Sequence, residues 1–245
     1  MKQAMIFAAG LGTRLKPLTD HMPKALVVVE GMTLLERVVR SLKAAGTERI
    51  VINVHHFADM IEAFLRDNDN FGMDVRVSDE REGLLETGGG LKHAAHLFDK
   101  DDTILIHNVD ILSNVHLDAL YDKGAAHDAV LVVSERKTKR YLLFDDDMRL
   151  KGWTNIETGE VKSVFGDINP KDYHMYAFSG IHTFAPSLLD KMKTYPDKFG
   201  IIDFYLNACA EADIRGYVKN DLMLMDVGKA ETIDQAKDFL DRLTK

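Results

Sequence analysis

The chain has 245 residues, of which 46% are hydrophobic and 29% charged, an ordinary globular composition that can bury one substantial core. Its formal net charge of −8 opposes non-specific binding to nucleic acid. No apolar run approaches the roughly 20 residues that a membrane-spanning helix needs, and the N-terminus lacks the basic flank and cleavage site of a signal peptide. The single cysteine, Cys209, excludes an internal disulfide framework and a thiolate zinc site. We therefore expect one cytoplasmic domain over residues 1–245 that binds neither nucleic acid nor membranes.

Strand-like apolar runs alternate with segments of helical spacing through the first half of the chain. The runs cover residues 4–8, 50–54, 75–77, 103–106 and 129–133, and the helical segments cover residues 34–45, 58–65 and 91–97. Thr33 is a suitable N-cap for the first helix, because Glu36 follows three residues later as in a capping box. The alternation predicts an α/β fold with a doubly wound, mostly parallel, Rossmann-like sheet.

The pattern changes after about residue 135. Shorter strand-like segments follow at residues 141–144, 149–153 and 176–182, with three consecutive aspartates between the first two. We expect them to form a small antiparallel insertion that covers one side of a ligand site, because ligands of open α/β sheets bind beyond the carboxyl ends of the strands. A final helix is expected over residues 230–243.

A glycine-containing loop directly follows the first strand. Glycines at positions 10 and 12 allow positive φ angles and close approach of the backbone to a ligand, so amide N–H groups can point at phosphate oxygens. Arg14 and Lys24 add positive charge. The glycine spacing matches neither a P-loop nor a dinucleotide fingerprint, and the alternative is an ordinary turn with solvated basic residues. The candidate nucleotide-binding residues of the loop are Ala8, Ala9, Gly10, Gly12 and Thr13.

Two aspartates stand at the ends of apolar runs. Asp110 follows the run over residues 103–107, and Asp226 follows the run over residues 222–225. Carboxylates delivered by two strand ends suit Mg²⁺, which takes one or two protein carboxylates together with water and phosphate oxygens. The alternative is that both are ordinary acidic residues of turns.

Two further segments contain glycine where the backbone could approach a ligand. Residues 86–90 include three glycines, among them Gly88, before the helical segment at 91–97, which predicts free N–H donors at a helix N-terminus. The alternative for this segment is a flexible hinge. Ser179 and Gly180 interrupt a strand-like run, which is typical of close backbone approach.

The motif Gly-x-Gly-Thr-Arg-Leu-x-Pro-Leu-Thr over residues 10–19, followed by Pro23 and Lys24, resembles the signature of the sugar-1-phosphate nucleotidyltransferases. The resemblance continues in family order and covers nearly the whole chain. The further matching segments are residues 86–90, 108–110, 178–180 and 226–228. Within the family the chain is most similar to short enzymes of the N-acetylmuramate-1-phosphate uridylyltransferase type.

The resemblance implies a role for each matching segment. Residues 1–134 would form the nucleotide-binding part, and residues 135–245 the sugar-binding part and closing helix. Asp110 and Asp226 would hold Mg²⁺. The implied catalytic residues are Arg14 and Lys24, Gly88 and Asn108 join the nucleotide-binding set, and the sugar-binding candidates are Glu157, Ser179 and Gly180.

Two positions depart from the common family pattern. Val109 stands where relatives usually have glycine, so the loop should be narrower by one side chain. Lys229 stands where relatives usually have threonine, and we expect its side chain to extend into solvent from the last helix.

The activity implied is the Mg²⁺-dependent transfer of a nucleotidyl group from a nucleoside triphosphate, with UTP favoured, to a sugar 1-phosphate. The products would be a nucleotide sugar and pyrophosphate, and the enzyme would act as a monomer or small homo-oligomer. One alternative is a mannose-1-phosphate guanylyltransferase that uses GTP. Another is a catalytically silent domain that binds a nucleotide sugar and regulates a partner.

Overall fold

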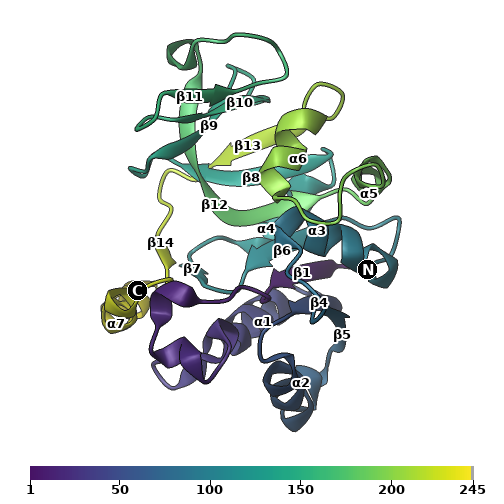
Figure 1. Cartoon of the computed structure of the whole chain (residues 1–245), viewed down its shortest axis with the longest axis vertical. Helices are drawn as coiled ribbons and strands as arrows, with labels where there is room; N and C mark the ends of the chain where they lie inside the picture. Colours follow the sequence, from purple (N-terminus) through teal and green to yellow (C-terminus); the bar gives the residue numbers. More distant parts are fainter. Residues whose placement is uncertain (244–245) are drawn as a thin grey trace.

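A parallel sheet of four strands forms the centre of the fold. The computed structural model describes residues 1–243, and its strand order places β1 between β4 and β6, with β5 beyond β4. All three pairings are parallel. The bounds are Gln3–Phe7 for β1, Arg49–Val54 for β4, Asp74–Asp79 for β5 and Ile104–Asn108 for β6. Helices cover both faces of this sheet, which explains why its central strands are continuous apolar runs (Figure 1).

The second half of the chain extends the sheet with antiparallel strands. β12 pairs with β9 along residues 174–176 and with β6 along residues 181–184. Its other edge pairs with β8, which also pairs in parallel with β13. The bounds are Ala129–Ser134 for β8, Arg140–Phe144 for β9, Leu150–Asn155 for β10, Glu160–Lys162 for β11, His174–Phe184 for β12 and Ile214–Val218 for β13. The expected antiparallel insertion is therefore confirmed.

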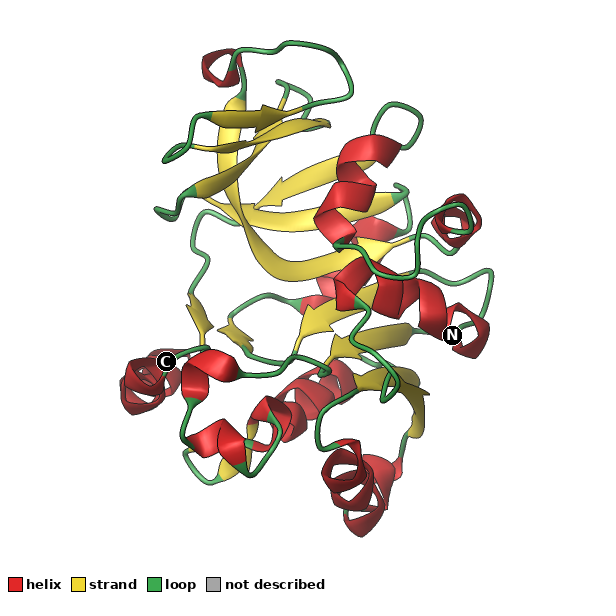
Figure 2. Ribbon diagram, viewed as in Figure 1, coloured by secondary structure: helices red, strands yellow, loops and turns green. Residues whose placement is uncertain are grey.

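One strand does not take the expected partner. Residues 129–133 were expected to continue the parallel sheet, but β8 is separated from β6 because β12 lies between them. The register of β12 shifts between Phe178 and His182, where Gly180 adopts a φ of +79°. This irregularity is the place at which β12 changes its partner from β9 to β6 (Figure 2).

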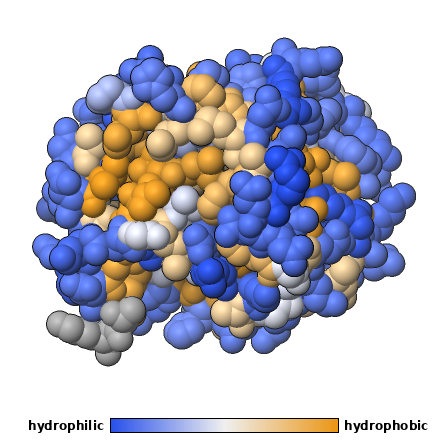
Figure 3. Space-filling view, turned by 90° about the horizontal axis from the view of Figure 1, so that it is seen from below, coloured by the Kyte–Doolittle hydropathy of each residue, from blue (hydrophilic) through white to orange (hydrophobic). Residues whose placement is uncertain are grey.

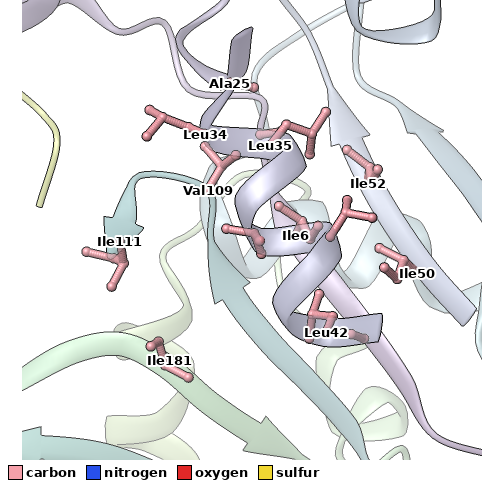
Figure 4. Close-up of a cluster of buried hydrophobic side chains, with 14 of the residues drawn as sticks. Ile6, Ala25, Leu34, Leu35, Leu42, Ile50, Ile52, Val109, Ile111 and Ile181 are labelled. Carbon is pink, nitrogen blue, oxygen red and sulfur yellow. The ribbon is translucent and has the colours of Figure 1, made fainter. Parts of the chain in front are cut away.

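Two hydrophobic clusters, one on each face of the sheet, hold the helices. α1, α2, α4 and α7 contribute to the first cluster, and α3, α5 and α6 to the second. Figure 4 shows Leu34, Leu35 and Leu42 of α1 lying over Ile6 and Ile50 of the sheet. The helices are α1 (Leu34–Ala44), α2 (Ala58–Asp67), α3 (Glu86–His93), α4 (Leu117–Gly124), α5 (Ser187–Met192), α6 (Ile201–Ala208) and α7 (Ala230–Leu243). The doubly wound α/β architecture is thus confirmed.

Local signals placed two helices correctly. The Thr33 side chain accepts a hydrogen bond of 3.1 Å from the Glu36 amide, so the expected N-cap of α1 is confirmed. α7 begins and ends at the expected residues. The remaining short elements are β2 (Val28–Val29), β3 (Met32–Thr33), β7 (Ile111–Ser113), β14 (Leu224–Asp226), and the 3₁₀ helices η1 (Thr13–Leu15), η2 (Leu18–Asp20), η3 (Lys24–Leu26), η4 (Asp69–Gly72), η5 (Ala94–Leu97) and η6 (Pro170–Asp172).

The face of the molecule seen from below is largely hydrophilic and includes an apolar area (Figure 3). Across residues 1–243, none of the helices combines the length and the hydrophobicity needed to cross a bilayer.

Candidate active site

A cleft of about 550 Å³ opens beyond the carboxyl ends of β1 and β6. Its walls come from residues 7–14 together with Lys24, from Leu84, Glu86 and Thr87, and from residues 108–110. Asn53 and Gly228 complete the lining. An open α/β sheet is expected to bind its ligand in this position, because the loops that follow neighbouring parallel strands meet there.

The loop after β1 depends on one of its two glycines. Gly12 has a φ of +63°, and a Cβ atom on it would lie 2.9 Å from Thr19 Cγ2 and 3.1 Å from Lys24 Cβ. The Thr19 hydroxyl donates to the Gly12 carbonyl at 2.8 Å and holds this turn. Gly10 has no positive φ, and a Cβ there would meet nothing within 4 Å. The expectation of a left-handed conformation at Gly10 is therefore wrong, whereas at Gly12 it is confirmed.

A buried polar pair that sequence reasoning missed anchors this loop. Asn53, at the end of β4, accepts hydrogen bonds from the amides of Ala8 at 2.7 Å and Ala9 at 3.3 Å. Its amide group donates to Glu80 at 2.7 Å, and the second oxygen of Glu80 accepts from the Leu85 amide at 3.2 Å. Both side chains are 3% exposed, and burial raises the pKa of Glu80. The available signal was a single asparagine inside the apolar run over residues 50–54.

This pair has a consequence for the two alanines assigned to nucleotide binding. Ala8 and Ala9 line the cleft, but their amides already donate to Asn53 and are not free to bind phosphate. Thr13 and Arg14 also line the cleft, in and beside the 3₁₀ turn η1 that follows Gly12. The amides available to a phosphate group must therefore come from the later part of the loop.

The two predicted metal ligands lie side by side because a small sheet joins them. β7 and β14 pair antiparallel, with Asp226 opposite Ile111, and the Val227 amide donates to the Asp110 carbonyl at 2.9 Å. Lys24 is 7% exposed and forms an ion pair with Asp110. Its Nζ atom also lies 3.9 Å from Asp226 Oδ1. The sequence predicted these three residues for one site, and the structure brings them together.

Burial and neighbouring charges both affect the carboxyl group of Asp226. Burial raises the pKa of this carboxyl, and the neighbouring charge of Asp110 raises that pKa further. Lys24, Arg14 and, more distantly in the sequence, Arg136 oppose the shift. A Cβ atom on Gly228 would lie 3.1 Å from an Arg14 nitrogen and 2.6 Å from Asp226 Oδ1, so both side chains border Gly228.

These carboxylates fit a divalent cation. Residues 1–243 contain no group of three or more His, Cys, Asp or Glu side chains that could hold a metal by themselves. Mg²⁺ does not require one, since two protein carboxylates with water and substrate phosphate oxygens complete its shell. Burial and the neighbouring charge of Asp110 raise the pKa of Asp226, and such a cation would relieve the repulsion from Asp110.

The glycines after Glu86 do not form a loop of free donors. They lie within the first turns of α3, and the amides of Gly88 and Gly89 both donate to the Phe199 carbonyl, at 2.9 and 3.1 Å. A Cβ atom on Gly88 would lie 2.4 Å from Phe199 Cε2. The expectation of free N–H groups is wrong, because these glycines allow α3 to pack against the segment before α6. Glu86 and Thr87 line the cleft instead.

The residues assigned to the sugar lie in three different settings. Ser179 is 2% exposed, and its hydroxyl accepts from the Ile181 amide at 3.2 Å. Gly180 packs against the cleft residue Asn108, whose amide nitrogen would be 2.5 Å from a Cβ at that position. Glu157, on the turn between β10 and β11, pairs with Lys139 at 2.6 Å. Neither Ser179 nor Glu157 borders the 550 Å³ cleft.

With the geometry in view, comparison with known proteins identifies the family. Residues 3–242 match the family model described as nucleotidyl transferase. The chain belongs to the nucleotidyl transferase family. The resemblance seen in the sequence motifs is thus confirmed.

Curated relatives of this nucleotidyl transferase act on different sugars. An N-acetylmuramate alpha-1-phosphate uridylyltransferase of Caulobacter vibrioides is 46% identical over 127 residues, covering 51% of this chain and 52% of the relative. The chain therefore spans about half the length of this relative. A mannose-1-phosphate guanyltransferase of Gibberella zeae is 27% identical over 248 residues, covering 97% of this chain and 62% of the relative.

Solved structures agree on the fold. HddC from Yersinia pseudotuberculosis, complexed with GMP-PN, has a TM-score of 0.75 at 21% identity and covers 98% of this chain and 100% of its own. A putative glucose-1-phosphate thymidylyltransferase from Bacillus anthracis has a TM-score of 0.78 at 17% identity, covering 97% of this chain and 94% of its own. At these identities the likeness concerns the Rossmann-like fold alone.

The two departures from the family pattern occupy different environments in this nucleotidyl transferase. Val109 lines the cleft but is only 4% exposed, because it also packs in the hydrophobic cluster under α1. Lys229 precedes α7 and is exposed, and its amide donates to the Thr232 hydroxyl at 3.3 Å. The expected orientation of Lys229 toward solvent is consistent with this exposure.

Proposed function

We propose that this nucleotidyl transferase transfers a nucleotidyl group, in an Mg²⁺-dependent reaction, from a nucleoside triphosphate to a sugar 1-phosphate. The observation on which this rests is that Lys24, which pairs with Asp110 and lies 3.9 Å from Asp226 Oδ1, shares a cleft with Asp110 and Arg14. Residues 1–134 would bind the nucleotide, and residues 135–245 would form the sugar-binding part and the closing helix. UTP is favoured, because the relative with 46% identity is a uridylyltransferase.

The chemistry requires one in-line displacement. An oxygen of the sugar phosphate forms a bond to the α-phosphorus, and the bond from that phosphorus to the bridging oxygen of pyrophosphate breaks. The nucleophile is already an anion, so neither a general base nor a covalent enzyme intermediate is required. Catalysis then depends on positioning the substrates and neutralising the charge of their phosphates.

The named residues suit these tasks. Arg14 and the amides that follow Gly12 bind the departing pyrophosphate, where negative charge develops. Lys24 reduces the repulsion between the two anionic substrates, because its ammonium group is held at the carboxylates of Asp110 and Asp226. Mg²⁺ bound by these two carboxylates supplies further neutralisation of phosphate charge.

The other properties of the protein follow from this proposal. A nucleoside triphosphate and a sugar 1-phosphate are its partners, and a cytoplasmic location gives it access to both. It would act as a monomer or small homo-oligomer. The second candidate function is transfer from GTP to mannose 1-phosphate, because guanyltransferases align with 97% of the chain.

The proposal is tested by measuring pyrophosphate release with Mg²⁺, crossing four nucleotides with four sugars. The nucleotides are UTP, GTP, dTTP and CTP, and the sugar phosphates are those of N-acetylmuramate, N-acetylglucosamine, glucose and mannose. We expect the highest rate with UTP. A dominant rate with GTP and mannose 1-phosphate would establish the second candidate. No pyrophosphate release with any pair of substrates would support a regulatory domain that binds a nucleotide sugar.

The metal assignment has its own test. Asp110→Asn is expected to abolish activity, because it removes one of the two carboxylates at the cluster. Asp234→Asn is the matched control, since it makes the same change at an exposed position of α7. If the Asp110→Asn enzyme remained active and Mg²⁺-dependent, the metal would have to be bound by other residues.

A further inference from the structure

A second cavity, of about 510 Å³, lies among the antiparallel strands, bordered by β9, β10 and α6. Three aromatic side chains contribute to its lining: Tyr141, Trp153 and Phe178. Aromatic faces of this kind pack well against the C–H groups of a sugar ring, and the backbone of the same strands supplies polar atoms at their edges. This cavity shares no lining residue with the cleft that contains Lys24 and Asp110.

The cavity also contains three cationic side chains, and two of them lack a carboxylate partner within the described residues 1–243. Lys162 lies 3.6 Å from Asp203 and 3.8 Å from Glu160, both of which line the cavity. Arg136 donates to the Phe178 carbonyl at 3.0 Å. Neither Arg136 nor Arg140 has an ion-pair partner anywhere in residues 1–243. The two guanidinium groups are therefore available to an anion from outside the protein.

Several contacts connect this cavity to the active-site cleft. Arg136 is near enough to Asp226 to lower the pKa of that carboxyl. Two residues beyond Phe178, Gly180 packs against Asn108, which lines the cleft. On the opposite side, the first amide of α6 donates to the Thr87 hydroxyl at 2.9 Å, and Thr87 also lines the cleft. These contacts place the cavity directly beside the cleft.

We propose that this cavity binds the sugar of the sugar 1-phosphate and that Arg140, together with Arg136, selects a sugar bearing a carboxylate. A guanidinium binds a carboxylate through two parallel hydrogen bonds, which gives direction as well as charge. N-acetylmuramate differs from N-acetylglucosamine by a lactyl ether that ends in such a carboxylate. The inference rests on the proposed function, since it names the substrate class of the same site.

The test compares two sugars that differ only in this carboxylate. Pyrophosphate release is measured with saturating UTP and either N-acetylmuramate 1-phosphate or N-acetylglucosamine 1-phosphate. We expect wild type to prefer the acidic sugar at least tenfold in kcat/KM. Arg140→Met should lower that ratio about tenfold, with the value for the neutral sugar nearly unchanged, because only the carboxylate loses its partner. Arg136→Met should lower the ratio as well.

Lys137→Met is the matched control. Lys137 belongs to the same basic segment and is exposed, but it lines neither cavity, so both values of kcat/KM should stay at the wild-type level. Equal losses for the two sugars in Arg140→Met, or an unchanged ratio, would overturn the inference. A wild-type preference for the neutral sugar would overturn it too while leaving the proposed function standing.

A binding measurement separates the two claims without requiring turnover. Calorimetry compares UDP-N-acetylmuramate with UDP-N-acetylglucosamine on wild type and Arg140→Met. Tighter binding of the acidic product by wild type, lost in the variant, supports the inference. Equal binding of both products by wild type contradicts it, and absence of binding by either product, with silence across the substrate grid, contradicts the proposed function itself.

Discussion

Two buried histidines make the stability of this protein sensitive to mild acid. His107 on β6 is 4% exposed, and its Nδ1 atom lies 2.8 Å from the Asn108 carbonyl oxygen. His182 on β12 is 1% exposed, and neither of its ring nitrogens has a hydrogen-bond partner in the described part of the chain. Burial lowers the pKa of His107 to about 4 and the pKa of His182 to about 3, the second also through the nearby charge of the first.

The direction of the effect follows from proton counting. In the unfolded chain a histidine has a pKa of about 6.5. Below that pH the unfolded state therefore binds more protons than the folded state. The stabilisation is complete above about pH 6.5 and is lost as the pH falls toward the folded values near 4 and 3. As the pH falls from about 6.5 to about 4.5, each histidine lowers the free energy of unfolding by about 2 kcal/mol. The two together lower it by about 4 kcal/mol.

The measurement is urea denaturation followed by circular dichroism at several pH values between about 4.5 and 7. Carboxylates also begin to titrate at the acidic end, so the informative quantity is the difference between wild type and His182→Leu. As the pH falls from about 6.5 to about 4.5, the free energy of unfolding of this variant should decrease by about 2 kcal/mol less than that of wild type. His96→Gln, which replaces an exposed histidine, is the matched control. Identical pH dependence in wild type and His182→Leu would refute the reasoning.

Two further predictions concern the cleft and the packing of α3. Arg14→Ala and Lys24→Ala should each lower turnover about a hundredfold or more, through lost stabilisation of phosphate charge, without unfolding the protein. If either variant released pyrophosphate at a near-normal rate, the residue it replaces would not be catalytic. Gly89→Ala should lower the unfolding free energy by roughly 3 kcal/mol, because its Cβ would lie 2.1 Å from the Asp197 carbonyl oxygen. Gly83→Ala, whose Cβ would meet nothing within 4 Å, should stay close to wild type in the same urea titration.

The sequence by itself determined the elements whose signals are local. The apolar runs became β1, β4 and β6, since strands covered on both faces must be hydrophobic throughout, and the short run at residues 75–77 became the edge strand β5. The capping residue Thr33 and the helical spacing after it determined α1, and the spacing of the last segment determined α7. The motif after β1 indicated the family, because its arginine, lysine and second glycine occupy fixed positions along one short stretch of chain.

Only the tertiary structure decided which distant segments meet. It placed β12 between β6 and β8. It also brought the amides of Gly88 and Gly89 into hydrogen bonds with the Phe199 carbonyl, and the side chain of Asn53 into a hydrogen bond with the loop after β1. Each of these depends on hydrogen bonds between residues far apart in the chain. A periodic pattern tells which face of an element is buried but not which partner covers it. For the same reason, the sequence alone did not show that Arg136 and Arg140 line one cavity and have no ion-pair partner among residues 1–243.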